Sequence, residues 1–328
     1  MAKINARIIG TGAYLPEKIY DNAYFEKILD TSDEWITERT GIKERHIAPP
    51  EMASSDLATE AAKKAIKVSG ISAKDIEAII CATITPDMFF PPTACFVQKN
   101  LGIKNSAAFD VAAVCSGFIY ALTVADSFIK AGKFKKVLVI GVEVMSKIID
   151  YTDRTTCVIF GDGAGAAVVS AEKGSRGILS THIYSDGSYS HLIQMPGGGS
   201  RNPCSMEVIE KRLPFVKMKG RETFKIAVRA MEQCCRDALE TNNLEPKDID
   251  IFVPHQANKR IIDAVAQRLK IPEEKIIVTI HKHGNTSAAS VPMALNEAVE
   301  EGKIKEGDYV LMSAFGGGLS WGSILMKW

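Results

Sequence analysis

The sequence predicts an α/β protein made of two similar halves, in which mostly parallel sheets are covered by helices. Stretches with strand and helix character alternate along the chain, which is typical of crossover connections between parallel strands. Some strand stretches, such as 136–140, are almost continuously apolar, as expected for strands buried on both faces. The motif Lys-Asp-Ile, followed by a buried strand, occurs once in each half, at 74–76 and at 247–249.

The first half is expected to begin with a strand near the N-terminus and then to alternate helices with strands. Its expected elements are a strand at 1–10, a helix at 54–69, a strand ending at 81, a helix ending at 103, a strand at 107–114, a helix at 115–131, and strands at 137–142 and 165–170. A turn that begins at Gly70 separates the first helix from the buried strand that follows it.

The second half repeats this plan with elements of similar length. Its expected elements are a helix at 222–241, a strand at 249–253, a helix ending at 271, a strand at 275–280, a helix at 285–301, and strands at 309–313 and 321–327. The halves join around 174–187, which divides the chain into 1–174 and 175–328. Many α/β proteins share this rhythm without duplication, but the common Lys-Asp-Ile register favours duplication here.

Composition narrows the possible functions. Of 328 residues, 46% are hydrophobic and 24% are charged, as in soluble globular proteins, and the net charge of +1 gives no reason to expect nucleic acid as a partner. No apolar run suits a membrane span or a signal peptide. The seven cysteines include no Cys-x-x-Cys pair, so neither a disulfide framework nor a zinc site is expected. A reducing cytoplasm fits this pattern.

Cys115 lies where the expected strand at 107–114 meets the expected helix at 115–131. The first turn of a helix carries a positive partial charge, so a thiol held there is expected to ionise more easily and to act as a nucleophile. The alternative is a small apolar residue that fills a tight corner. If the halves are related by twofold symmetry, the position of Cys115 corresponds to Asn285 or Thr286.

Two further segments carry candidate chemistry. His255 follows a strand at its carboxyl end, where ligand sites of α/β proteins gather, although a lone histidine often only satisfies a loop carbonyl. Asn285 opens a helix, and its amide could stabilise an oxyanion or simply cap that helix. His281 and His283 are near, but no carboxylate cluster supports a metal site.

Two glycine-rich runs link strands. The run at 314–322 could bring backbone N–H groups to a ligand, or it could be a plain hairpin turn. The run at 161–165 has a spacing like that of a dinucleotide-binding loop. It precedes a strand instead of opening a helix, so that interpretation is rejected.

Together these motifs resemble the β-ketoacyl-acyl carrier protein synthase III family over essentially the whole chain. The motifs are 114–118, 254–258, 283–287 and 315–318, with 31–36, 39–42, 44–48 and 160–166 also similar. The resemblance implies a thiolase-like fold, in which duplicated halves form a five-layered αβαβα arrangement, and a homodimer.

The resemblance also implies a reaction, the decarboxylative Claisen condensation of a short acyl-CoA with malonyl-acyl carrier protein. Cys115 would carry the acyl group, while His255 and Asn285 would stabilise the enolate formed from malonyl-acyl carrier protein. Backbone N–H groups of Cys115 and Gly317 would form the oxyanion hole. No metal or redox cofactor is implied.

Binding roles follow from the same resemblance. The CoA-binding residues would be Trp35, Arg39, Arg154, Gly220, Phe224, Ala257 and Asn258. The contacts with the acyl carrier protein would be Lys225, Gln256, Ala257, Asn258, Lys259 and Arg260. Phe90, reaching the partner subunit's acyl pocket, and Phe315 would shape the acyl site, and this suggests a small primer such as acetyl.

Some features leave alternatives open. Thr155 stands where glycine is frequent in the family, and the segment 195–219 is longer than in some relatives. A thiolase-fold acyltransferase or condensing enzyme of secondary metabolism could share the triad and use another acceptor. A true thiolase would carry a second cysteine within 315–322, and this chain has none there. A non-catalytic CoA-binding or carrier-protein-binding module is disfavoured because the triad is intact.

Overall fold

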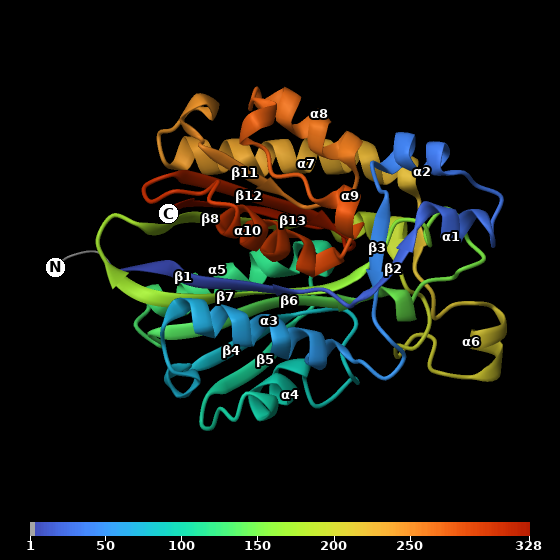
Figure 1. Ribbon diagram of the computed structural model, residues 1–328, viewed down its shortest axis with the longest axis horizontal. Helices are drawn as coiled ribbons and strands as arrows, with labels where there is room; N and C mark the ends of the chain where they lie inside the picture. The colour runs from blue at the N-terminus through green and yellow to red at the C-terminus, as the bar shows by residue number, and fades with distance from the viewer. Residues whose placement is uncertain (1–3) are drawn as a thin grey trace.

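The computed structural model describes residues 4–328, which form two large β-sheets and three layers of helices, stacked alternately (Figure 1). Helices α5 (Gly117–Lys130) and α10 (Ser290–Glu300) lie between the sheets. One outer layer contains α3 (Ser54–Ser69) and α4 (Thr93–Asn100), and the other contains α7 (Gly220–Thr241) and α8 (Lys259–Leu269). The five-layered arrangement expected from the resemblance is therefore confirmed.

The first sheet has five strands in the order β1-β7-β6-β4-β5. They are β1 (Ile4–Tyr14), β4 (Ala78–Ala82), β5 (Ala107–Val111), β6 (Lys136–Val144) and β7 (Asp162–Lys173). β4 is parallel to β5 and β6, whereas β7 is antiparallel to β1 and β6. The chain crosses over through α4 and α5 on opposite faces of this sheet, which places the carboxyl ends of β4 and β5 at one edge.

The second sheet has four strands in the order β11-β12-β13-β8. They are β8 (Gly177–Ser185), β11 (Ile251–Pro254), β12 (Tyr309–Gly316) and β13 (Ser320–Lys327). β11 and β12 are parallel, and the other neighbours are antiparallel. The expected junction at 174–187 covers the connection from β7 to β8 and the whole of β8. The division of the chain at residue 174 stays a prediction.

The prediction of a strand at 275–280 was wrong. Only one bridge, between Phe252 and Ile276, joins this segment to β11, and α9 (Ile280–His283) begins where the strand should end. The buried amide of Gln256 is the reason. Its Nε2 donates to the carbonyl oxygen of Ile277 at 3.0 Å, and its Oε1 accepts from the backbone N of Thr279 at 2.8 Å. A side chain therefore occupies backbone groups that a neighbouring strand would have used.

Apolar side chains from both sheets pack on α5 and α10 in one continuous core, with Phe118, Leu122, Val291 and Leu295 fully buried. Small residues allow close packing on the outer face of the first sheet. A Cβ on Gly10 of β1 would lie 2.5 Å from the carbonyl oxygen of Ala65 in α3. Such close approach is possible only with glycine at this position.

Short elements gather at one end of the molecule, beside the strand ends that carry the candidate site (Figure 1). They are β2 (Lys18–Asp21), α1 (Asn22–Glu26), α2 (Asp33–Thr40), β3 (Glu44–Ile47), β9 (Ile193–Gln194), α6 (Met206–Glu210) and β10 (Lys217–Met218). No helix in the range 4–328 is long and apolar enough to cross a bilayer. The same residues contain no cluster of His, Cys, Asp and Glu suited to holding a metal ion.

Candidate active site

Cys115 lies in a short 3₁₀ turn, Val114–Ser116, between β5 and α5. Its side chain is buried, and burial raises the pKa of its thiol to about 12. The nearby carboxylate of Glu143 raises this pKa further, while a hydrogen bond with Ser287 lowers it. The expectation of an easily ionised thiol was therefore wrong, because the cost of burying a thiolate outweighs the favourable helix start.

The corresponding turn in the second half is Ser287–Ala289, between the His283 region and α10. Val114 and Ser287, the first residues of the two turns, share an unusual φ of 48°. The counterpart of Cys115 is therefore Ala288, and the expected match with Asn285 or Thr286 was wrong. The expected match was wrong because the second helix was expected to begin at 285, whereas α10 begins at Ser290.

His255 follows β11 directly and is almost fully buried. Its backbone N donates to the carbonyl oxygen of Ser313 at 2.7 Å, which fixes the residue beside β12. Its Nδ1 lies 2.5 Å from Ser290 Oγ, and the backbone N of Gln256 donates to the same hydroxyl at 3.3 Å. In the tautomer in which Ser290 Oγ donates to Nδ1, the ring proton lies on Nε2. Burial lowers the pKa of His255 to about 3, so the ring is neutral at physiological pH.

Asn285 is held between two first-half residues. Its backbone N donates to the carbonyl oxygen of Ile159 at 2.9 Å, and its carbonyl oxygen accepts from Gly161 N at 3.1 Å. The side-chain Oδ1 accepts from the backbone N of Ser287 at 2.8 Å. Because Oδ1 is engaged in this way, Nδ2 is the polar group that the amide can offer to a ligand.

Cys115, His255 and Asn285 line one cavity of about 790 Å³, although they come from distant parts of the sequence. Most other residues proposed from the sequence line it as well. These are Trp35, Arg39, Arg154, Gly220, Phe224, Lys225, Ala257, Asn258, Arg260 and Phe315. A cavity of this size accommodates an extended ligand of drug-like or larger size.

Trp35 projects from α2 and is flanked by two arginines. The guanidinium of Arg39 lies 4.9 Å from the centre of the indole, and that of Arg154 lies 5.4 Å from it. Both arginines are exposed, whereas Trp35 is half-buried. A flat ring beside two exposed cations is suited to binding an aromatic group that carries phosphates.

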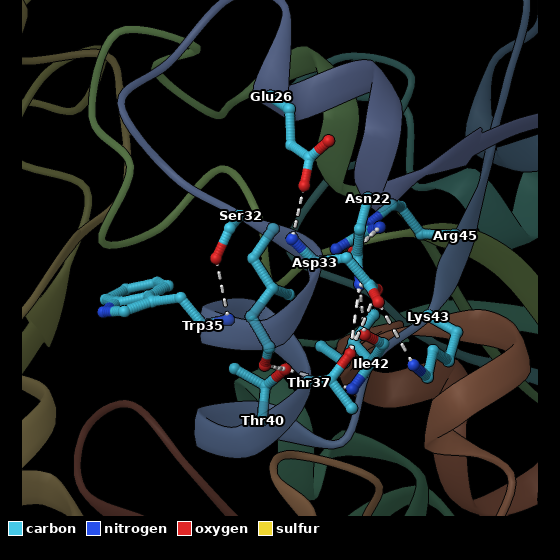
Figure 2. A network of polar contacts seen from close by, with 11 residues as sticks. Asn22, Glu26, Ser32, Asp33, Trp35, Thr37, Thr40, Ile42, Lys43 and Arg45 are labelled. Atoms are coloured by element: carbon cyan, nitrogen blue, oxygen red, sulfur yellow. Dashed lines mark hydrogen bonds and ion pairs between the residues drawn. The ribbon is translucent and has the colours of Figure 1, made fainter.

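Helix α2 is fixed by a polar network that the sequence analysis did not identify (Figure 2). Asn22 Nδ2 donates to Asp33 Oδ1 at 2.7 Å and to the carbonyl oxygen of Ile42 at 2.9 Å, so it joins both ends of the helix. Asn22 Oδ1 accepts from Arg45 Nη1 at 2.8 Å. The fully buried Arg45 also donates to the carbonyl oxygen of Val158, which lines the cavity. This network fixes the position of Trp35 relative to the cavity wall.

The glycine run 316–318, at the end of β12 and in the turn that leads to β13, lies directly against Cys115. A Cβ on Gly316 would come within 2.7 Å of the backbone N of Cys115. Glycine is therefore required for this turn to approach the thiol. Gly317, the proposed oxyanion-hole residue, follows it immediately, although Gly317 itself is absent from the cavity lining in the described part of the chain.

Gln256 does not fit the role expected for it. Its side chain is 1% exposed, and its amide is engaged by Pro254, Ile277, Thr279 and Ile280. It cannot contact a carrier protein at the surface, because its hydrogen bonds hold the backbone beside β11. Lys259 and Phe90 also lie outside the cavity lining. Lys259 forms an ion pair with Asp263 at 2.5 Å, and Phe90 is 83% exposed.

Three other polar residues near the site were missed: Glu143, Ser287 and Ser290. One signal could have identified Glu143, because a single carboxylate interrupts an otherwise apolar strand, β6. The two serines lie in the small-residue segment 286–290, where their individual contacts are not readable from sequence.

Comparison with known proteins identifies the family. Residues 109–187 match the family model described as 3-oxoacyl-[acyl-carrier-protein] synthase III, and 239–328 match the model of its C-terminal part. The chain is 56% identical to the β-ketoacyl-[acyl-carrier-protein] synthase III of Aliarcobacter butzleri, covering 99% of this chain and 98% of that protein. It is 54% identical to the protein of that name from Caldanaerobacter subterraneus, with the same coverage.

A solved structure agrees with these relatives. The crystal structure of 3-oxoacyl-[acyl-carrier-protein] synthase III from Aquifex aeolicus superimposes with a TM-score of 0.92 at 51% identity, covering 98% of this chain and 100% of that one. The chain therefore belongs to the β-ketoacyl-[acyl-carrier-protein] synthase III family, the acyltransferases of the initiating condensation of fatty acid synthesis.

Proposed function

We propose that Cys115, His255 and Asn285 carry out the two halves of this condensation in the shared cavity. The observation that carries the proposal is their convergence on one cavity from three separate segments. In the first half-reaction the sulfur of Cys115 attacks the thioester carbonyl of an acyl-CoA. The bond from that carbonyl to the CoA sulfur breaks, the thiol proton goes to the departing CoA, and an acyl-cysteine remains.

In the second half-reaction malonyl-acyl carrier protein replaces CoA. His255 Nε2–H and Asn285 Nδ2–H donate to its thioester carbonyl and stabilise the enolate that forms as carbon dioxide leaves. The resulting carbanion attacks the carbonyl carbon of the acyl-cysteine, the bond to the Cys115 sulfur breaks, and the sulfur leaves as a thiolate that takes a proton from solvent to restore the thiol. Neutral imidazole suits this role, because the low pKa of His255 keeps the ring a hydrogen-bond donor instead of a cation across the physiological range.

Acyl-CoA is proposed to enter past Trp35. The adenine would stack on the indole, and Arg39 and Arg154 would contact the phosphates and the ring. Gly220, Phe224, Ala257 and Asn258 line the path toward Cys115 and would enclose the pantetheine arm. Arg39 and Arg154 both lie over Trp35 in this structure, so adenine stacking requires one of these arginines to move aside.

Malonyl-acyl carrier protein is proposed to dock beside the same entrance. Lys225 and Arg260 are exposed there, and Lys259 is half-buried next to them. This basic surface suits an acidic partner even though the chain as a whole is nearly neutral. Ala257 and Asn258 remain in the proposed contact, and Gln256 is excluded by its burial.

The proposal also includes a homodimer and a small acyl primer. Met88, Phe89 and Phe90 are 49%, 80% and 83% exposed in one loop. Such an apolar cluster is unusual on a monomer and is typical of a surface covered by a partner. In a dimer Phe90 would enter the partner subunit's acyl site, with Phe315 on the other side, and would leave room for acetyl or a similar short group. Sedimentation velocity would contradict the dimer if the chain sediments as a monomer at micromolar concentration.

Separate assays of the half-reactions test the central proposal. Cys115→Ser should abolish acyl-enzyme formation, measured by intact mass after incubation with acetyl-CoA. Asn285→Ala should retain the acyl-enzyme but lose carbon dioxide release from malonyl-acyl carrier protein. Equal loss of both steps in Asn285→Ala would contradict the division of roles. Product mass from competing primers with malonyl-acyl carrier protein would identify the acyl group and exclude a different acceptor.

A further inference from the structure

We propose that Glu143 is a positioning residue for the decarboxylation step, acting on Asn285 through Ser287. Its carboxylate holds the turn that contains Ser287, and Ser287 in turn fixes the orientation of the Asn285 amide. The inference rests on the role proposed above for Asn285. It assigns a function to a buried acidic group that the condensation mechanism does not itself use.

Glu143 is a carboxylate placed where a strand is otherwise apolar. It belongs to β6 and is 0% exposed. Its carboxyl group accepts hydrogen bonds from the hydroxyls of Thr83, Thr85 and Ser287 and from the backbone N of Ile84. Burying a carboxylate is costly, and hydrogen bonds offset only part of that cost. Burial raises its pKa to about 7 despite these donors, so stability alone is a weak reason for its presence.

Ser287 connects Glu143 to Asn285. Its Oγ donates to Glu143 Oε1 at 3.1 Å, and its backbone N donates to Asn285 Oδ1 at 2.8 Å. Ser287 has a φ of 48°, a left-handed conformation that is unfavourable for serine. The bond to Glu143 fixes the side chain of Ser287 in this turn. The conformation directs its N–H at Asn285 Oδ1, and this leaves Asn285 Nδ2 for the malonyl thioester.

The same carboxylate also holds the loop that follows β4. Its Oε2 accepts from Thr85 Oγ1 at 2.6 Å and from the backbone N of Ile84 at 3.2 Å. Ile84 lines the cavity, and the chain continues from Thr85 toward the exposed loop with Phe90. Glu143 therefore contacts two segments at once. One is the cavity wall that leads into the loop with Phe90, and the other is the turn that orients Asn285.

A double-mutant cycle tests this connection. Glu143→Gln, Asn285→Ala and the double variant are compared in two assays: acyl-enzyme formation from acetyl-CoA, and carbon dioxide release from malonyl-acyl carrier protein. We expect Glu143→Gln to slow decarboxylation about tenfold while leaving acyl-enzyme formation within about twofold of the wild type. In the Asn285→Ala background, Glu143→Gln should have no further effect, because the group on which it acts is already absent.

Ser287→Gly is the matched variant. Glycine adopts a φ of 48° without strain but lacks Oγ, so it removes the link to Glu143 together with the hydrogen bond between Ser287 and Cys115. We expect decarboxylation to be lost as in Glu143→Gln, and we expect Glu143→Gln to slow decarboxylation no further in the Ser287→Gly background. This variant also tests the inference if Glu143→Gln fails to fold, which its melting temperature will report.

The outcomes separate the inference from the proposed function. Wild-type decarboxylation in Glu143→Gln, or additive effects in the double variant with Asn285→Ala, would overturn the inference while the role of Asn285 stands. Equal slowing of both half-reactions by Glu143→Gln would show a general structural role and would also overturn it. Full decarboxylation in Asn285→Ala would instead overturn the proposed function.

Discussion

The two 3₁₀ turns that face each other at the centre of the molecule have the same backbone and different chemistry. The turn Val114–Ser116 carries Cys115, and the turn Ser287–Ala289 carries Ala288 at the corresponding position. Each begins with a residue at a φ of 48° and each leads into a helix of the central layer. Duplication therefore supplies two equivalent positions, and only one of them carries a thiol.

The strands beside these turns differ in the same way. The registers of β4 with β6 and of β11 with β12 make Val137 equivalent to Val310, and six residues further along Glu143 is equivalent to Gly316. Glu143 binds Ser287 in the second turn, whereas Gly316 lies against Cys115 in the first. Each half thus contacts the other half's turn, one with a carboxylate and one with bare backbone. The difference indicates that the amide of Asn285 must be held in one orientation, whereas Cys115 must have free space beside it.

The largest effect is expected from removing the thiol that distinguishes the two turns. Cys115→Ala makes the turns alike, with a methyl group at both positions. Condensation should fall by at least about a thousandfold, because no acyl-enzyme can form. Intact mass after incubation with acetyl-CoA measures this directly. An acyl adduct of wild-type yield in the variant would show that another residue is the nucleophile.

The pH dependence of alkylation tests which of two effects determines the pKa of Cys115: burial, which raises it, or the position at a helix start, which lowers it. With a pKa raised to about 12, the thiolate fraction should increase about tenfold per pH unit. The rate of inactivation by iodoacetamide should therefore rise about a hundredfold from pH 7 to pH 9. Because Cys204 is exposed, modification must be followed on the Cys115 peptide by mass spectrometry. A rate that levels off below pH 8 would show that the helix start lowers the pKa after all.

Much of the fold was predictable because it is encoded by local patterns. The helix at 54–69 matches α3 residue for residue, and the continuous apolar run of β6 indicated burial correctly. The prediction of a strand at 275–280 failed because the side chain of Gln256, which is distant in sequence, forms hydrogen bonds with the backbone groups of this segment. Local propensity carries no information about such a contact. The prediction of an ionisable Cys115 failed similarly, since burial depends on the whole tertiary structure.

The residues of the candidate site also fall into two groups: those that local sequence reveals and those that only the tertiary structure reveals. The positions of Cys115, His255 and Asn285 at element ends could be read from the sequence, and they do converge on one cavity. Asn22 and Arg45 could not be recognised, because their importance lies in bonds between segments that are distant in sequence. A polar residue that supports a site has no motif of its own, and its role becomes visible only from its partners.

Gly316→Ala tests the need for space beside Cys115. The added methyl group would lie 2.7 Å from Cys115 N and 3.2 Å from its Cβ, so the turn must shift. We expect acyl-enzyme formation to slow at least about tenfold, since displacements of this kind are costly in a preorganised site. Gly187→Ala, where a Cβ meets nothing within 4 Å, is the control and should react like the wild type. If Gly316→Ala acylates at the control rate, the close approach is not needed for the reaction.

The smallest effect concerns stability, and it tests whether Glu143 is retained at a thermodynamic cost. The pKa of Glu143 is raised from 4.5 to about 7, mainly by burial. Between these values the folded protein keeps a proton that the unfolded chain has released, so the wild type loses stability as pH rises. Glutamine does not titrate. Relative to Glu143→Gln, the wild type should therefore lose about 2.5 kcal/mol of unfolding free energy between pH 5 and pH 8. Other titrating groups affect both proteins and cancel in this difference.

Urea unfolding at the two pH values measures the difference in unfolding free energy between the two proteins. A difference that does not change with pH would mean that the carboxylate is not destabilised by burial. Because Gly316 shows that the equivalent strand position needs no acidic group, a measured cost would strengthen the case that Glu143 is retained for its action on Asn285.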